Sequence, residues 1–128
     1  MKKALLACLL LVACASQKDR KSDKEIFVYE FKIHYFKKCL KYGFGDSPEI
    51  QRILALDKSG YSEPVLGMLY IEIDSLAKKR AMYYKLLDIN STKEHTGASK
   101  KERVLSNCLC DYNSKWLDSI IKKKYKGN

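Results

Sequence analysis

The stretch that decides the fold is DKEIFVYEFKIHYFKKCLKYGFG, Asp23 to Gly45. Its large apolar residues recur at the spacing of one broad helical face: Phe27, Phe31, Tyr35 and Cys39, with Val28, Phe36 and Leu40 beside them. Ser22 and Glu25 have the spacing of a capping box, and the glycines at the end provide a stop. The segment Phe31–Tyr35 also alternates like a strand. Because the apolar stripe persists for more than three turns, we predict a helix.

The rest of the chain contains three further helix signals. Asp46–Glu49 combines a capping residue, a proline in the first turn and an acid at the positive end of the helix dipole, and predicts a short helix. A second helix starts on the same logic at Ser62 and runs to about Leu87. A capping box at Ser99 starts the last helix, which we predict to run through Ile121. The sequence therefore predicts an all-α fold, a small bundle of four to five helices.

The chain opens with MKKALLACLLLVACAS, which is typical of an export signal. Its apolar run, Ala4–Ala13, is too short to span a bilayer. Leu11-Val12-Ala13-Cys14 resembles the lipobox of bacterial lipoproteins, so we predict removal of residues 1–13 and lipidation of Cys14. The Ala-Ser pair that follows favours the outer membrane of a Gram-negative bacterium. Ordinary cleavage after Ala13-Cys14-Ala15 also fits, and either route delivers the mature protein to the periplasm.

After the signal, the chain divides into a tether and one domain. Residues 14–24 are polar and charged without apolar periodicity, which is typical of a flexible tether. Residues 25–128 form the predicted helical domain, with a modest core. The formal net charge of +10 falls to +8 because Lys2 and Lys3 are lost with the signal. A basic chain suggests nucleic acid, an anionic membrane face or an acidic protein as partner, and export argues against nucleic acid.

Few residues of this chain could carry catalysis. The two histidines, His34 and His95, lie in different predicted segments, and there is no HExxH, GxSxG or glycine-rich phosphate loop. His34 falls on the polar side of the first helix, where we expect an ordinary surface histidine. Cys39 lies on the same helix but points in a different direction, so the two do not form a thiol nucleophile and its base. We expect a protein without catalytic activity and without a cofactor.

Three cysteines remain once Cys14 and the signal are set aside. Cys108 and Cys110 lie two positions apart on the last predicted helix, so their directions differ by about 200° and they do not both face the core. Cys108 belongs to the apolar stripe of that helix, with Leu105, Leu109, Tyr112, Trp116 and Ile120. Cys110 shares the polar side with Asp111. Since Cys39 also lies on an apolar stripe, we predict a Cys39–Cys108 disulfide between the first and last helices, with Cys110 left over. No four-ligand zinc spacing is present.

Several motifs together resemble the Tai immunity proteins, which pair with the Tae peptidoglycan amidases of type VI secretion. The most specific motif is Cys108-x-x-x-Tyr112-x-Ser114-Lys115-x-Leu117-Asp118. Weaker matches are Cys39-Leu-Lys-Tyr-Gly-Phe44 and Gly60-Tyr61-x-Glu63. The most similar branch is the one paired with the fourth amidase class, and the resemblance covers most of residues 27–125. Cys110 departs from the family, which has a carboxylate there, and Asp111 is shifted by one position.

The resemblance implies a periplasmic, dimeric, all-α protein that protects a bacterium from an injected NlpC/P60-like amidase. In that branch, one helix packs on the amidase, and a protruding loop before the last helix plugs the catalytic cleft. Carried to this sequence, the helix surface lies near Tyr61–Tyr70, with Tyr61, Glu63 and Tyr70 as contact residues. The plug is the polar loop Asn90–Ser99, and its tip consists of Lys93, Glu94, His95, Thr96 and Gly97. An ordinary solvated connection is the alternative for this loop.

A second class of function also fits the composition. A small basic lipoprotein of the cell envelope could bind anionic lipid or peptidoglycan through its lysines. Stoichiometric inhibition of an amidase encoded by the neighbouring gene would separate the two hypotheses, because only an immunity protein would inhibit it.

Overall fold

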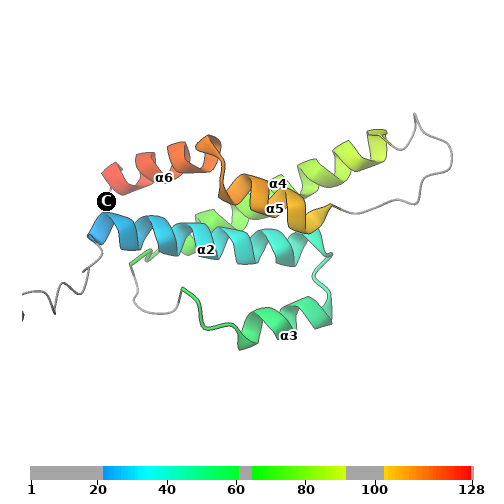
Figure 1. The fold of residues 1–128 in the computed structure, drawn as a ribbon, viewed down its shortest axis with the longest axis horizontal. Coiled ribbons are helices and arrows are strands. Elements are labelled where there is room, and N and C mark those ends of the chain that lie inside the picture. Colours follow the sequence, from blue (N-terminus) through cyan, green and yellow to red (C-terminus); the bar gives the residue numbers. More distant parts are fainter. Residues whose placement is uncertain (1–21, 61–64, 92–102, 128) are drawn as a thin grey trace, which may run out of the picture.

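The structure, a computed structural model, describes residues 22–60, 65–91 and 103–127. These residues form five helices and no strand, which confirms the all-α prediction: α2 (Asp23–Gly43), α3 (Pro48–Leu56), α4 (Leu69–Ser91), α5 (Val104–Tyr112) and α6 (Lys115–Gly127). α2 is central and packs against each of the other four. In Figure 1, α3 lies on one side of α2, and α5 and α6 lie on the other. The predicted signal and the lipidation site Cys14 lie outside the described residues.

α2 forms because its start and one of its faces are both satisfied. The Ser22 hydroxyl accepts a hydrogen bond from the Glu25 backbone N–H, and the Glu25 carboxylate accepts one from the Ser22 backbone N–H, so the predicted capping box is confirmed. The predicted stripe is buried, with at most 3% of each side chain exposed: Phe27, Phe31, Tyr35 and Cys39. The strand alternative for Phe31–Tyr35 is therefore wrong.

The hydrophobic core lies where the later helices cover this stripe. Around α4 it contains Leu66, Leu69, Ile73 and Ala77. α6 contributes Leu117 and Ile121, which are at most 1% exposed. Full burial of one such aliphatic side chain stabilises a fold by about 1.5–3 kcal/mol. The contacts between α2 and the chain after residue 65 therefore supply most of the apolar stabilisation in the described residues.

A disulfide joins Cys39 of α2 to Cys108 of α5, as predicted. Their Cα atoms are 5.8 Å apart, the two residues are 69 positions apart in sequence, and both are buried. Cys110 is a free, exposed cysteine. The disulfide thus fixes the first described helix to the first part of the predicted last helix.

The predicted single last helix is wrong, because the chain forms α5 and α6 with a break at Asn113 and Ser114. The Ser114 hydroxyl accepts a hydrogen bond from the Leu117 backbone N–H at 3.1 Å, in the geometry of a helix N-cap. The break changes which side chains of α6 face α2. Three members of the predicted inward stripe are exposed instead: Leu105, Leu109 and Trp116.

The helix predicted from Ser62 begins later than expected. Residues 65–68 are described and are not helical, and α4 starts at Leu69 and ends at Ser91. Gly67 has a positive φ of 49°, which a helix does not accommodate. The predicted start of α3 is confirmed, since the Ser47 hydroxyl accepts a hydrogen bond from the Ile50 backbone N–H at 3.3 Å. α3 contains no buried residue.

Candidate functional site

Most of the predicted partner-contacting residues lie outside the described residues. These are Tyr61 and Glu63, and all of the loop tip: Lys93, Glu94, His95, Thr96 and Gly97. Tyr70 is described, as the second residue of α4. It is 36% exposed, and its ring packs edge-on against the His34 ring with the centroids 4.8 Å apart. One side of Tyr70 is therefore taken up by packing, and the other faces solvent.

His34 is buried, at 8% exposure, so the prediction of a surface histidine is wrong. Its Nε2 lies 2.7 Å from the Gly60 carbonyl oxygen. Because a carbonyl only accepts, this nitrogen donates the hydrogen bond. Helical periodicity places His34 on a polar side correctly, but that side is covered by a segment that follows α3. No pattern within the helix itself reveals this cover.

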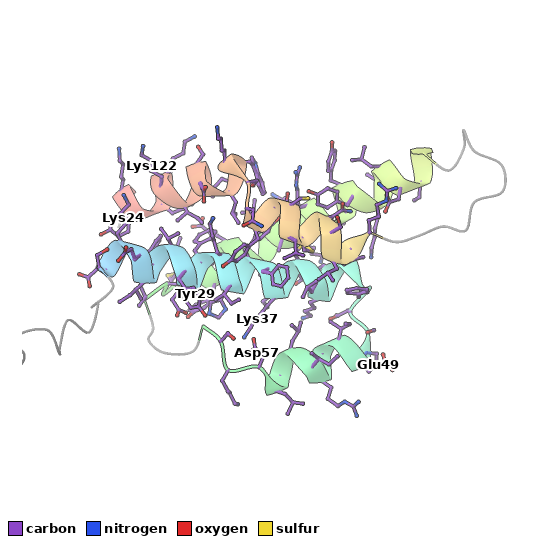
Figure 2. All side chains as sticks on the ribbon, in the orientation of Figure 1. Lys24, Tyr29, Lys37, Glu49, Asp57 and Lys122 are labelled. Atoms are coloured by element: carbon purple, nitrogen blue, oxygen red, sulfur yellow. A yellow bond between two sulfur atoms is a disulfide. The ribbon has the colours of Figure 1, made fainter. Side chains whose placement is uncertain are left out.

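Lys37 fixes the same segment one turn further along α2. Its ammonium donates to the Ser59 carbonyl at 2.6 Å and pairs with the Asp57 carboxylate at 2.9 Å. Figure 2 shows Lys37 and Asp57 pointing toward one another across the space between α2 and the chain after α3. Hydrogen bonds from Ser59 and Lys37 lower the pKa of Asp57 to about 2. The carboxylate is therefore ionised at neutral pH, as the ion pair requires.

The chain crosses α2 at Gly60 too closely for a side chain. A Cβ at this position would lie 2.7 Å from Ile33 Cγ2 and 3.1 Å from His34 Nε2. The φ of Gly60 is also positive, at 81°, which residues with a Cβ rarely adopt. The segment leading to Tyr61 and Glu63 therefore has a fixed starting point on α2.

The C-terminal half of α4 carries an exposed apolar surface. Five of its large apolar side chains are at least 44% exposed: Met82, Tyr83, Leu86, Leu87 and Ile89. In the view of Figure 1, the last turns of α4 extend past the end of α2. Soluble proteins seldom expose contiguous apolar surface unless it meets a partner. We call these residues the α4 apolar surface.

α5, the first described helix after the predicted plug loop, also exposes apolar side chains. Leu105 and Leu109 lie one turn apart on α5 and are 54% and 44% exposed. A hollow of about 240 Å³ lies where α4, α5 and α2 meet, and its lining includes Gly43, Ala81 and Val104. The first two residues of the predicted loop, Asn90 and Ser91, are instead the last residues of α4. The helices described before and after the loop both expose apolar side chains.

Asp111 holds α5 against α2 and α4, although it was predicted to lie on a polar side. It is 1% exposed. Its carboxylate accepts hydrogen bonds from the hydroxyls of Tyr35 at 2.7 Å and Tyr84 at 2.6 Å, and from the Arg80 guanidinium at 3.1 Å. Burial and the bond to Asp111 raise the pKa of Tyr84 to about 12, and they raise the pKa of Tyr35 well above its usual value. Both phenols stay protonated and act as donors.

Arg80 extends this network to α6. Its guanidinium carbon lies 4.7 Å from the centre of the Trp116 ring and 4.8 Å from that of Tyr84. Such cation–π contacts contribute about 0.5–2 kcal/mol, depending on solvent exposure. Together with the disulfide, the network fixes the positions of α4, α5 and α6 on α2.

Other kinds of site are not indicated by the described residues. In residues 22–60, 65–91 and 103–127 there is no group of three or more His, Cys, Asp or Glu side chains that could hold a metal ion. None of the helices described is long and apolar enough to cross a membrane. Comparison of the chain with protein-family models, with curated proteins and with solved structures gave no match.

Proposed function

We propose that this chain is a periplasmic immunity protein that binds a peptidoglycan amidase of type VI secretion and occludes its catalytic cleft. The observation that carries the proposal is the α4 apolar surface, together with Leu105 and Leu109 of α5. These exposed side chains flank both ends of the loop that the resemblance to the Tai proteins identifies as the plug. A protein of this kind catalyses no reaction, and it inhibits the amidase only through its fit to the enzyme.

In this proposal, two parts of the surface have different roles. The α4 apolar surface supplies affinity, since large apolar side chains are the usual anchors of a protein interface. The loop tip, Lys93–Gly97, enters the cleft and blocks it sterically, so none of its residues needs to react. Tyr61, Glu63 and Tyr70 form a second contact with the amidase near the start of α4. The basic mature chain speeds association with an acidic partner.

The proposal includes a homodimer, as in the Tai branch that the sequence resembles. The exposed apolar side chains of α4 and α5 support either a second copy or the amidase as the partner. Light scattering of the isolated protein, and of its mixture with the amidase, gives the stoichiometry of both states.

The loop provides the decisive test. Replacing Lys93–Gly97 with a minimal linker should weaken inhibition of the amidase encoded by the neighbouring gene more than it weakens binding. The melting temperature should stay nearly unchanged, because long loops contribute little to stability beyond their closure entropy. Full inhibition by the shortened variant at equal stoichiometry would assign occlusion to the helix surface.

A matched pair of substitutions tests the apolar surface. Leu86 and Ile53 are each 59% exposed, on α4 and α3 respectively. Leu86→Glu should lower affinity for the amidase at least tenfold, since loss of an apolar anchor costs more than about 1.4 kcal/mol. Ile53→Glu should leave the affinity unchanged. Calorimetric titration measures both, and equal effects would place the interface elsewhere.

A further inference from the structure

The last helix carries more positive charge than its neighbours can neutralise. α6 contains five lysines and a single acidic residue, Asp118. That aspartate already pairs with Lys32 of α2 at 2.6 Å. Lys124 pairs with Glu72 of α4. Lys122, Lys123 and Lys126 are exposed and form no ion pair with the residues that the structure describes.

Two of these lysines border a groove between the end of α6 and the start of α2. The groove has a volume of about 400 Å³; Lys24, Lys122 and Lys126 are among its lining residues, as are Val28, Ile121 and Tyr125. Figure 2 shows Lys24 and Lys122 at the same end of the molecule, where α2 begins and α6 ends. We call this the α2–α6 groove. It combines an apolar floor with lysine stems whose ammonium groups reach solvent.

The acidic groups near the groove leave it basic. Asp118 lines the groove but is paired with Lys32. Asp23 and Glu25 lie in the first turn of α2. The Glu25 carboxylate is held by the backbone N–H and the hydroxyl of Ser22. Three lysines line the groove against one aspartate, which is already paired, so the α2–α6 groove suits an anionic group.

The groove lies close in sequence to the predicted lipidation site, which favours a membrane as its anionic partner. Cys14 and Ser22 are eight residues apart, so even a fully extended chain separates them by at most about 29 Å. If Cys14 is lipidated, the beginning of α2 stays within that reach of the bilayer. The Gly43 end, near the α4 apolar surface, is a helix length away, because the 21 residues of α2 span about 31 Å.

We propose that the α2–α6 groove docks on the phosphate headgroups of an anionic membrane, through Lys24, Lys122 and Lys126. Docking turns the α4 apolar surface away from the bilayer. The proposal rests on the predicted lipidation of Cys14, which would anchor the proposed immunity protein, but not on amidase binding. A bilayer is favoured over an acidic protein because it is the anionic surface within reach of the chain, and because flexible lysines on an apolar floor suit mobile headgroups.

Partitioning between two kinds of vesicle tests the proposal. The exported full chain carrying Cys14→Ser, which removes the acyl contribution, is mixed with phosphatidylcholine vesicles and with vesicles containing about a quarter phosphatidylglycerol. The chain should prefer the anionic vesicles. The triple variant Lys24→Gln, Lys122→Gln, Lys126→Gln should reduce that preference roughly a hundredfold at an ionic strength of about 0.1 M, at about fivefold for each lysine.

A second triple variant controls for total charge. Arg52, Lys58 and Lys79 are exposed and do not line the groove, and their replacement by Gln removes the same formal charge. This variant should change the preference by less than about threefold, because charges beyond the Debye length of about 10 Å are screened. Equal losses from the two triple variants would overturn the proposal, since total charge alone would then explain binding.

Amidase inhibition separates this proposal from the proposed function. In solution, without vesicles, the Lys24/Lys122/Lys126 variant should inhibit the amidase as the unaltered chain does. Loss of inhibition with unchanged vesicle preference would assign the groove to a protein interface and overturn membrane docking. If the amidase is not inhibited by any form of the chain but the groove lysines still control vesicle preference, the docking proposal stands and the proposed function fails.

Discussion

Asp111 shows how a single side chain fixes the relative positions of several helices. Its carboxylate is almost fully buried, and its donors come from α2 and α4: Tyr35, Tyr84 and Arg80. A buried charge costs several kcal/mol in desolvation unless such partners compensate it. Since the three partners lie on different turns or helices, their hydrogen bonds to Asp111 together fix the position of α5. The carboxylate therefore contributes specificity of packing as well as stability.

Removal of this carboxylate should be strongly destabilising. Asp111→Ala leaves Arg80 and two phenols without their acceptor, and we expect the free energy of unfolding to fall by about 3–5 kcal/mol. Urea unfolding measures this loss. Tyr84→Phe removes one donor to the carboxylate and should cost about 1.5–3 kcal/mol. This milder variant still tests the network if Asp111→Ala does not fold.

The control for Asp111 is another aspartate in an ion pair. The Asp118 side chain is 53% exposed and pairs with Lys32. Asp118→Ala should cost less than about 1 kcal/mol, because solvent screens exposed pairs. Equal losses for the two aspartates would contradict the role given to the buried network.

The sequence correctly predicted the burial of side chains that lie on the apolar stripe of their own helix. It failed for side chains that are buried by residues distant in the sequence. Cys39 and Cys108 were predicted as a pair because each lies on the apolar stripe of its own helix. Asp111 and His34 were placed on polar sides and are nevertheless buried. Their partners lie 26 or more positions away, so periodicity within one helix carries no information about them.

At the scale of the helices, the break between α5 and α6 is the feature that most changes the surface. The Ser114 hydroxyl accepts from the Leu117 backbone N–H and donates to the Asp111 carbonyl at 2.7 Å. Serine offers the backbone this alternative to a continuous helix. The restart turns Leu117 and Ile121 toward α2, and it leaves Trp116 partly exposed beside Arg80.

Loss of this cap should weaken the docking of α6. Ser114→Ala removes the side-chain acceptor of the Leu117 N–H, and we expect a loss of about 1 kcal/mol in unfolding free energy. Ser119→Ala, at an exposed position inside α6, is the control and should change stability by less than about 0.5 kcal/mol. Thermal or urea unfolding of the two variants in parallel gives the comparison. A neutral Ser114→Ala would mean that the break is set by packing alone.

The starts of α2 and α3 were predicted correctly because their signals are local. Ser22 and Ser47 cap these helices with their own side chains, within three residues of the helix start. The breaks before α4 and α6 were missed for another reason. Glycine and serine also occur inside helices, so the residue types at Gly67 and Ser114 do not by themselves show that the chain turns there. The sequence places the candidate plug loop between two helices, but it contains no local signal for the conformation of the loop.

The arrangement of the helices depends on the central helix α2 and on one disulfide. The Cys39–Cys108 disulfide closes a loop of 69 positions. In the chain-entropy description, a loop of that length stabilises the fold by about 4 kcal/mol, mainly by restricting the unfolded chain. The bond also lies beside the hollow between α2, α4 and α5.

Removal of the disulfide should lower the stability of the protein, while the all-α fold is kept. The double variant Cys39→Ala, Cys108→Ala should lower the free energy of unfolding by about 2–4 kcal/mol. Cys110→Ser, at the exposed free cysteine, should have no effect. Peptide mass spectrometry of the oxidised protein should show Cys39 bonded to Cys108. A Cys39–Cys110 bond would mean that α5 is rotated from the position described.

The central helix α2 is synthesised before the helices that cover its buried face. Among the described helices, α2 comes first in the chain, and its buried face is completed by α5 and α6, which come last. At synthesis rates of about 5–20 residues per second, Cys108 follows Cys39 after roughly 3–14 s. Throughout that interval the aromatic face of α2 lacks its final cover, and Cys39 lacks its partner. A chain cut short before Cys108 would never close the bond, so the disulfide forms only on molecules whose synthesis has passed this residue.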